Sequence, residues 1–247
     1  MRSLEILPVE SIPEVRPGDD LPELIGRAVG EDLRAGDVLI VTHKIISKSE
    51  GRLVDLTAVE PSALAKDFAA RYEKDPRQIE VVLRESRRIV RMDRGLIIAE
   101  THHGFVCANA GVDASNVPGD DVVCLLPVDP DASAAKLREA LAARTASGLA
   151  VIISDSFGRP WREGITNVAI GVSGMDPLAD YRGQRDPHGR PLEASVLAVA
   201  DELAAAAELV MGKTAGIPVA IVRGYPYERA SSTGRALLMP PERDLFR

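Results

Sequence analysis

The chain has 247 residues, 45% of them hydrophobic, so it is long enough to bury a substantial core in one large domain or two small ones. Its formal net charge of −7 excludes a general affinity for nucleic acid or anionic membranes. Only 4% of the residues are aromatic, and a core built from Ala, Val, Leu and Ile favours helices packed on sheets over an aromatic-rich β-sandwich.

The first half of the chain alternates strand and helix patterns. A strand over residues 4–9 precedes a turn at 16–20, which supplies the N-cap of a helix through about Leu33. The unbroken apolar run 38–41 predicts a buried strand. Two helices at about 61–72 and 76–84 follow, and then a hairpin over 87–99 that closes at Asp93-Arg94-Gly95.

The second half predicts further buried strands at 122–126 and 149–154, with a helix from Asp129 to about Arg144 between them. Residues 162–190 are rich in Gly and Pro and predict turns and a mobile loop around one strand at 169–172. An Ala-rich helix over 192–210 and a strand over 218–222 precede an irregular end.

These elements predict a mixed α/β fold. The sequence shows no internal repeat, so we expect a single domain over 1–247. A division into two compact, discontinuous subdomains, about 1–85 with 190–247 and about 86–189, is left open. Cys107 and Cys124 lie in apolar runs without a Cys-x-x-Cys pair, which predicts reduced core residues. No apolar run approaches the length of a membrane span, so we expect a cytoplasmic protein.

Two polar segments follow apolar strands and indicate a metal site. The run Val151–Ile153 leads into Asp155 and Ser156, and a second short strand leads into the turn that contains Asp113 and Asn116. Mg²⁺ and Mn²⁺ prefer such carboxylate, hydroxyl and amide oxygens and usually share them with substrate phosphates. The alternative is that both Asp residues only cap helices or turns.

A third segment carries positive charge. Thr42-His43-Lys44 and Lys48 follow the buried strand 38–41, and a Lys ammonium suits phosphate oxygens. A solvated basic turn is the alternative. His102 and His103 are adjacent and cannot converge on one ligand, so we interpret them as surface residues.

One apparent nucleotide motif fails on topology. Ala207-x-x-x-x-Gly212-Lys213-Thr214 fits a loose P-loop pattern, but a helix precedes the glycine and a strand follows it, the reverse of a P-loop. We predict that Gly212 ends the helix and that Lys213 lies at the negative end of its dipole. The residues alone therefore predict metal-assisted phosphoryl chemistry on an anionic substrate.

Several of these segments, in order, resemble the coenzyme F420-0:L-glutamate ligase family. The matching segments are Ile12-Pro13-Glu14 with 16–20, Val41–Lys48 with 50–52, 111–116, 126–131, Ser154–Arg162, 185–189 and 244–246. The resemblance implies an intertwined homodimer with a fold of its own, neither Rossmann nor P-loop. It further implies a GTP-dependent ligase that adds γ-linked glutamate to a deazaflavin precursor. Longer relatives carry a nitroreductase-like domain after the ligase, and we expect that activity to be absent here.

The resemblance also implies site residues. It assigns Asp113, Asp155 and Ser156 as ligands of Mg²⁺ or Mn²⁺, two ions per site, with Asp155, Asp113 and Lys48 as the catalytic residues; a K⁺ requirement is left open. The implied GTP-contacting residues are Ile12, Pro13, Glu14, Val15, His43, Lys48, Asn116, Met211, Gly212 and Lys213. This chain departs from the family pattern at His43, where many members have Ser, and at Lys213, where many have Gln as a further metal ligand. A protonated ammonium cannot ligate a cation, so we expect the second metal site to lack this ligand here.

The expected reaction transfers phosphate from GTP to the lactyl carboxylate of F420-0, and the amine of L-glutamate then displaces it to form an amide. Further γ-linked glutamates can follow. The alternatives are a metal-dependent phosphatase or nucleotide hydrolase that uses the same carboxylates, and a non-catalytic sensor of GTP or the deazaflavin.

Overall fold

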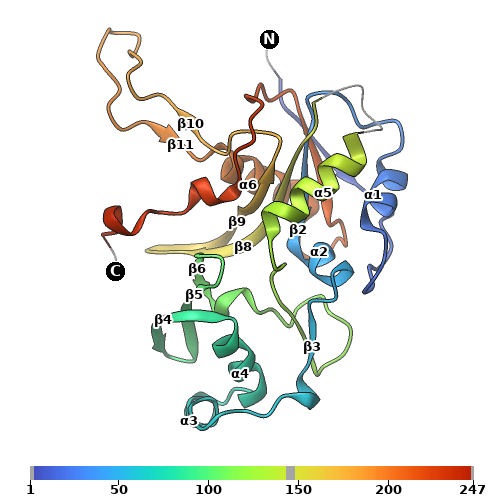
Figure 1. Cartoon of the computed structure of the whole chain (residues 1–247), viewed down its shortest axis with the longest axis vertical. Helices are drawn as coiled ribbons and strands as arrows, with labels where there is room; N and C mark the ends of the chain where they lie inside the picture. Colours follow the sequence, from blue (N-terminus) through green and yellow to red (C-terminus); the bar gives the residue numbers. More distant parts are fainter. Residues whose placement is uncertain (1–2, 143–147, 246–247) are drawn as a thin grey trace.

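A mixed sheet forms the centre of the protein (Figure 1), which a computed structural model describes for residues 3–142 and 148–245. Within these residues the sheet has five strands in the order β1-β12-β2-β8-β9. The strands are β1 (Glu5–Val9), β12 (Val219–Arg223), β2 (Val38–Thr42), β8 (Ala150–Arg159) and β9 (Arg162–Ser173). Only β2 and β8 run parallel, while the other neighbours are antiparallel.

Helices cover both faces of this sheet because successive side chains of each strand point to opposite sides. Leu39 and Val41 of β2 pack against α1 (Leu21–Val29), α2 (His43–Ser49) and α5 (Pro130–Ala142). Val38 and Ile40 pack on the opposite face against α6 (Val199–Met211). Unbroken apolar strands are therefore buried on both faces, as their sequences predict.

A second layer of structure lies below the main sheet in Figure 1 and has its own core, which includes Phe68 and Ile97. Its helices are α3 (Ala63–Tyr72) and α4 (Pro76–Arg84). Its strands are β4 (Ser86–Asp93), β5 (Leu96–Thr101) and β6 (Val106–Ala108), with β3 (Leu53–Asp55) paired to β7 (Val122–Cys124). Short 3₁₀ turns occur at Leu56–Ala58, Asn109–Gly111, Gly234–Leu237 and Pro241–Arg243.

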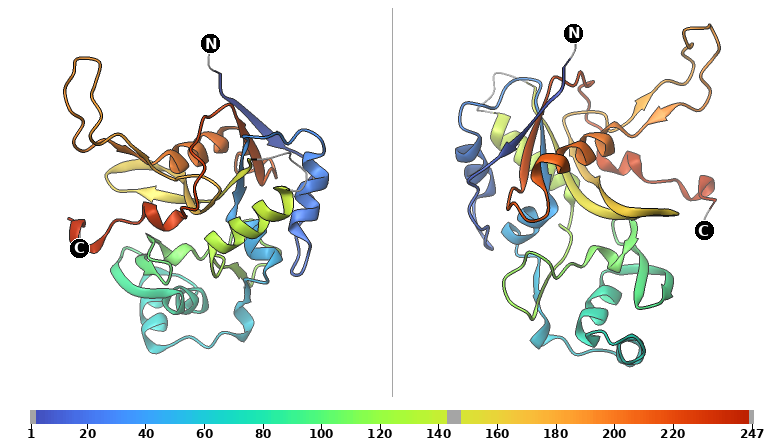
Figure 2. Two further views of the ribbon diagram at one scale, coloured as in Figure 1. Left: turned by 45° about the horizontal axis from the view of Figure 1, so that its top comes forward. Right: turned by 180° about the vertical axis from the view of Figure 1, so that it is seen from behind.

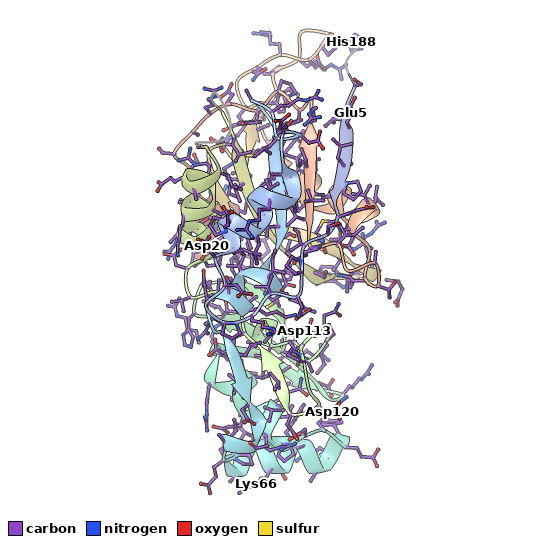
Figure 3. The ribbon with its side chains drawn as sticks, turned by 90° about the vertical axis from the view of Figure 1, so that its right-hand side faces the viewer. Glu5, Asp20, Lys66, Asp113, Asp120 and His188 are labelled. Carbon is purple, nitrogen blue, oxygen red and sulfur yellow. The ribbon has the colours of Figure 1, made fainter. Side chains whose placement is uncertain are left out.

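A long arm projects from the body, as both views in Figure 2 show. Its base is the short pair β10 (Ala179–Asp180) and β11 (Val196–Leu197). In Figure 3 His188 lies at the far end of the molecule from Lys66, and Asp113 lies between them.

The structure confirms the mixed α/β class and most predicted elements, including the hairpin that β4 and β5 form. Two helix boundaries were wrong by several residues. The helix α1 ends at Val29 because Gly30 takes a positive φ of 54°. The Ala-rich helix begins at Val199 rather than 192, since the preceding residues pair with the start of the arm. The predicted end of α5 near Arg144 lies outside the described residues.

The largest correction concerns residues 162–168, predicted as a loop. They form the first half of β9, which pairs with β8 from Val151 to Arg159. The strand β8 consequently continues past Ser154, so Asp155 and Ser156 lie within a strand and not in a turn after it.

The two cysteines are free and buried, as predicted. No helix in the described part of the chain has the length and apolar character needed to cross a bilayer. The division into subdomains stays a prediction.

Candidate active site

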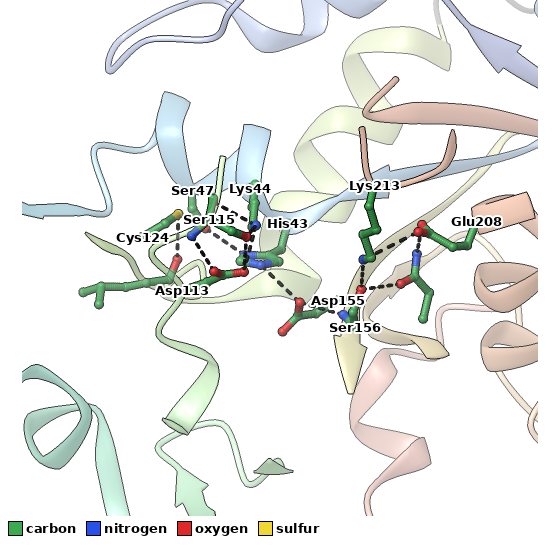
Figure 4. A network of polar contacts seen from close by, with 12 residues as sticks. His43, Lys44, Ser47, Asp113, Ser115, Cys124, Asp155, Ser156, Glu208 and Lys213 are labelled. Atoms are coloured by element: carbon green, nitrogen blue, oxygen red, sulfur yellow. Dashed lines mark hydrogen bonds and ion pairs between the residues drawn. The ribbon is translucent and has the colours of Figure 1, made fainter. Parts of the chain in front are cut away.

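The parallel pair of strands brings the first two polar groups together. Thr42 of β2 is the register partner of Ser154 of β8, so His43, which follows β2, lies beside Asp155, the next residue of β8. There His43, at the start of α2, places its Nε2 atom 3.3 Å from Oδ1 of Asp155, although the two are not aligned as a hydrogen bond. The imidazole is only 2% exposed, and its Nδ1 lies 3.4 Å from Ser47 Oγ (Figure 4).

The loop after β6 adds Asp113 to this group. The Lys44 ammonium lies 2.8 Å from Asp113 Oδ2 and also donates to Ser115 Oγ at 2.7 Å. Burial raises the pKa of the Asp113 carboxyl, but the hydrogen bonds from Lys44 and Ser115 outweigh this effect and leave the pKa below its usual value. Asp113 accepts a hydrogen bond from the Ser115 backbone at 2.6 Å, so the turn-forming role considered as an alternative is also present.

A second cluster surrounds Ser156. Its hydroxyl donates to Asn167 Oδ1 at 2.6 Å, and Asn167 Nδ2 donates to Glu208 Oε2 at 2.8 Å. The Lys213 ammonium donates to the Ser156 hydroxyl and lies 3.5 Å from Glu208 Oε1 (Figure 4). Gly212 ends α6 with a φ of 60°, which confirms its predicted role and excludes a P-loop, because the helix precedes the glycine.

One cavity of about 630 Å³ contains both clusters. Every predicted metal ligand and catalytic residue lines it, and so do the predicted nucleotide-contacting residues except Met211. Met211 is the last residue of α6 and is fully buried in the core. The lining residues among those predicted are Ile12, Pro13, Glu14, Val15, His43, Lys48, Asp113, Asn116, Asp155, Ser156, Gly212 and Lys213.

The basic segment 42–48 is not a solvated turn, because α2 buries His43, Ser47 and Lys48. The Lys48 ammonium lies 2.5 Å from Oε1 of Glu14, which also lines the cavity. A cation held in this way is suited to phosphate oxygens. The His102–His103 prediction was half right: His102 is exposed, but His103 is half-buried and contacts the Pro127 carbonyl at 2.8 Å.

The oxygen donors fit a divalent cation that completes its shell from substrate. Within the described residues no group of three or more His, Cys, Asp or Glu side chains could hold a metal on its own. Asp113 and Asp155 supply carboxylate oxygens to one cavity, and Mg²⁺ typically takes one or two carboxylates together with phosphates and water. Ser156 differs, because Lys213 already contacts its hydroxyl.

Sequence reasoning missed Asn167 and Glu208. Asn167 is only 3% exposed but falls in the stretch predicted as a loop, while Glu208 is one polar residue near the end of an Ala-rich helix. Ile165 and Asn167 both line the cavity and are two positions apart in the sequence. This spacing is typical of a strand and was the signal that could have placed Asn167 in the site.

The fold and the site define a mixed α/β protein with a cavity lined by paired cations and carboxylates, an arrangement suited to a phosphorylated substrate. The chain belongs to the F420-0:Gamma-glutamyl ligase family, whose sequence profile matches residues 10–224.

Curated relatives named Coenzyme F420:L-glutamate ligase are similar over nearly their whole length. The protein from Methanothermobacter thermautotrophicus is 48% identical over 99% of both chains. Those from Methanopyrus kandleri and Methanocaldococcus jannaschii are 48% and 42% identical over 100% of this chain and 100% and 98% of theirs.

Proposed function

We propose that this protein joins L-glutamate to coenzyme F420-0 and uses GTP to drive amide formation. The relatives' shared name supports the ligase and its two substrates. The use of GTP, the acyl phosphate and the addition of further γ-linked glutamates are our proposal. We also propose that the enzyme works in the cytoplasm as a homodimer.

The proposed reaction has two bond exchanges. The lactyl carboxylate oxygen attacks the γ-phosphorus of GTP, so that a new O–P bond forms while the bond to the β-phosphate oxygen breaks and GDP leaves. The glutamate amine then attacks the acyl carbon, the C–O bond to phosphate breaks, and the amine loses a proton as the amide forms. No covalent bond to the protein is needed.

The side chains of the cavity supply positioning and charge. Lys48 and Lys44, on one face of α2, would donate to phosphate oxygens and hold the transferring group in line. A divalent cation held by Asp113 and Asp155 would neutralise charge on those oxygens. His43, packed against Asp155, would fix the carboxylate in place.

One observation carries the proposal: Asp113, Asp155, Ser156 and Lys48 come from distant parts of the chain and line one cavity. A metal-dependent phosphatase could use the same groups, so the assay must follow both products.

The test combines purified protein with GTP, Mn²⁺, L-glutamate and F420-0, followed by mass analysis of the product. We expect a ladder of glutamylated products and GDP in step with each amide formed. Asp155→Asn should lower turnover by a factor of about a hundred or more, the scale of an electrostatic catalytic element. Asp67→Asn, on the exposed face of α3, is the matched control. Release of phosphate from GTP without any glutamylated product would support the hydrolase instead.

A further inference from the structure

The Ser156 cluster already contains a cation that belongs to the chain. The Lys213 ammonium contacts the Ser156 hydroxyl and forms an ion pair with Glu208 at 3.5 Å. An ammonium has three donors and no acceptor, so it takes up oxygen lone pairs in the same way that a metal ion would.

The local structure fixes this position. Gly212 ends α6 with a positive φ, and its backbone N–H makes the last helical hydrogen bond, to the Glu208 carbonyl at 3.0 Å, so the chain changes direction directly before Lys213. The Lys213 side chain consequently lies over Glu208 and not away from the helix, as Figure 4 shows. The buried Asn167 holds the other oxygen of the Glu208 carboxylate.

The Ser156 hydroxyl has little capacity left for a metal ion. Its proton points to Asn167 Oδ1, and one lone pair accepts from Lys213. An ion bound to the same oxygen at about 2.1 Å would lie within about 5 Å of the ammonium nitrogen. Two cations this close repel strongly inside a cavity, so each disfavours the other.

We propose that Lys213 replaces one of the two divalent cations implied by the family resemblance. The protein with bound nucleotide then holds a single divalent cation, on the side of Asp113 and Asp155, and the Lys213 ammonium contacts the phosphate oxygens on the side of Ser156 and Glu208. The inference rests on the proposed function, because it assumes that the cavity holds a nucleotide.

The experiment counts bound Mn²⁺ per chain by equilibrium dialysis with saturating β,γ-imido-GTP, and records the Mn²⁺ electron paramagnetic resonance spectrum. The wild type and Lys213→Arg should bind one ion and give an uncoupled spectrum. Lys213→Gln exchanges the ammonium for a neutral amide with a ligating oxygen. It should bind two ions with the spin coupling expected of metals about 4 Å apart.

Lys66→Gln is the matched control, since it removes the same charge from an exposed site on α3 and should match the wild type. Two ions on the wild type, or one ion on Lys213→Gln, would overturn the inference, as would two ions on Lys66→Gln. The ligase assay is read separately. Two ions with normal ligation would refute only the role of Lys213, whereas one ion without any ligated product would refute the proposed function.

Discussion

Lys48→Met is the substitution that best tests whether the cavity binds a triphosphate. The Lys48 side chain is only 7% exposed, and its ammonium forms an ion pair with Glu14, whose side chain is 63% exposed. Water therefore screens the carboxylate partner, and the Lys48–Glu14 pair itself contributes little to stability. Methionine fills the buried part of the site without the charge, so we expect a folded protein.

The magnitude follows from the hydrogen bonds of the ammonium. Glu14 takes one of the three Lys48 donors, and the side chain lines the cavity, so another donor can reach a phosphate oxygen. A hydrogen bond to a charged group contributes about 1.5–3 kcal/mol. At about 1.4 kcal/mol per tenfold change, Lys48→Met should weaken nucleotide binding by a factor of roughly 10 to 150.

Isothermal titration calorimetry with β,γ-imido-GTP and Mg²⁺ measures this change directly. Lys66→Met is the matched control, because it removes the same charge from an exposed site on α3, and we expect its affinity to stay within a few-fold of the wild type. An affinity of Lys48→Met within twofold of the wild type would show that Lys48 does not contact the phosphates.

Further predictions concern the scaffold and the site. Asp37 is 1% exposed and accepts two hydrogen bonds from Arg223, at 2.9 and 2.8 Å. Asp37→Ala would leave the Arg223 charge without its partner and should lower the free energy of unfolding by about 3 kcal/mol in urea titrations. A loss below about 1 kcal/mol would contradict this. A Cβ atom on Gly171 would lie 2.4 Å from the Pro130 carbonyl oxygen, so Gly171→Ala should lower the melting temperature, whereas Gly158→Ala, with open space around it, should not. Burial raises the pKa of the Cys107 thiol to about 12, so iodoacetamide at pH 8 should leave this thiol unmodified in the native protein. Rapid alkylation of Cys107, detected by mass analysis, would refute its burial. Mn²⁺ should bind more tightly with β,γ-imido-GTP present than alone, and equal affinities by titration calorimetry would exclude a shared site.

The sequence predicts the centre of the site because the strands that form it are unusual. The apolar runs of β2 and β8 are unbroken and therefore buried on both faces. Polar residues that directly follow such apolar runs lie where the buried part of the sheet ends, which is why His43 and Asp155 could be recognised as site candidates before their contact was known.

The remainder of the site depends on pairing that no local pattern contains. Residues 162–168 are mostly polar and include Gly164, so they resemble a loop. They nevertheless form a strand, because β8 satisfies their backbone groups across the tight turn at Pro160-Trp161. Asn167 can meet Glu208 only because β9 packs against α6. A contact between two elements that are not adjacent in sequence requires the sheet order, and the residue pattern does not supply it.

The ion pairs of the cavity explain why nucleotide and metal should bind together. Asp113 pairs with Lys44, Glu14 with Lys48 and Glu208 with Lys213, and in each pair the two residues come from different elements or turns. Phosphate oxygens that take the Lys44 ammonium would free Asp113 for a divalent cation, and a cation on Asp113 would in turn release Lys44 for phosphate. Each ligand thus removes a competitor of the other, and their binding free energies must be coupled with the same magnitude in both directions. Because the exchange uses side chains that α2 and the loop after β6 already hold in place, it costs little reorganisation, which is the property that makes fixed charges effective in catalysis.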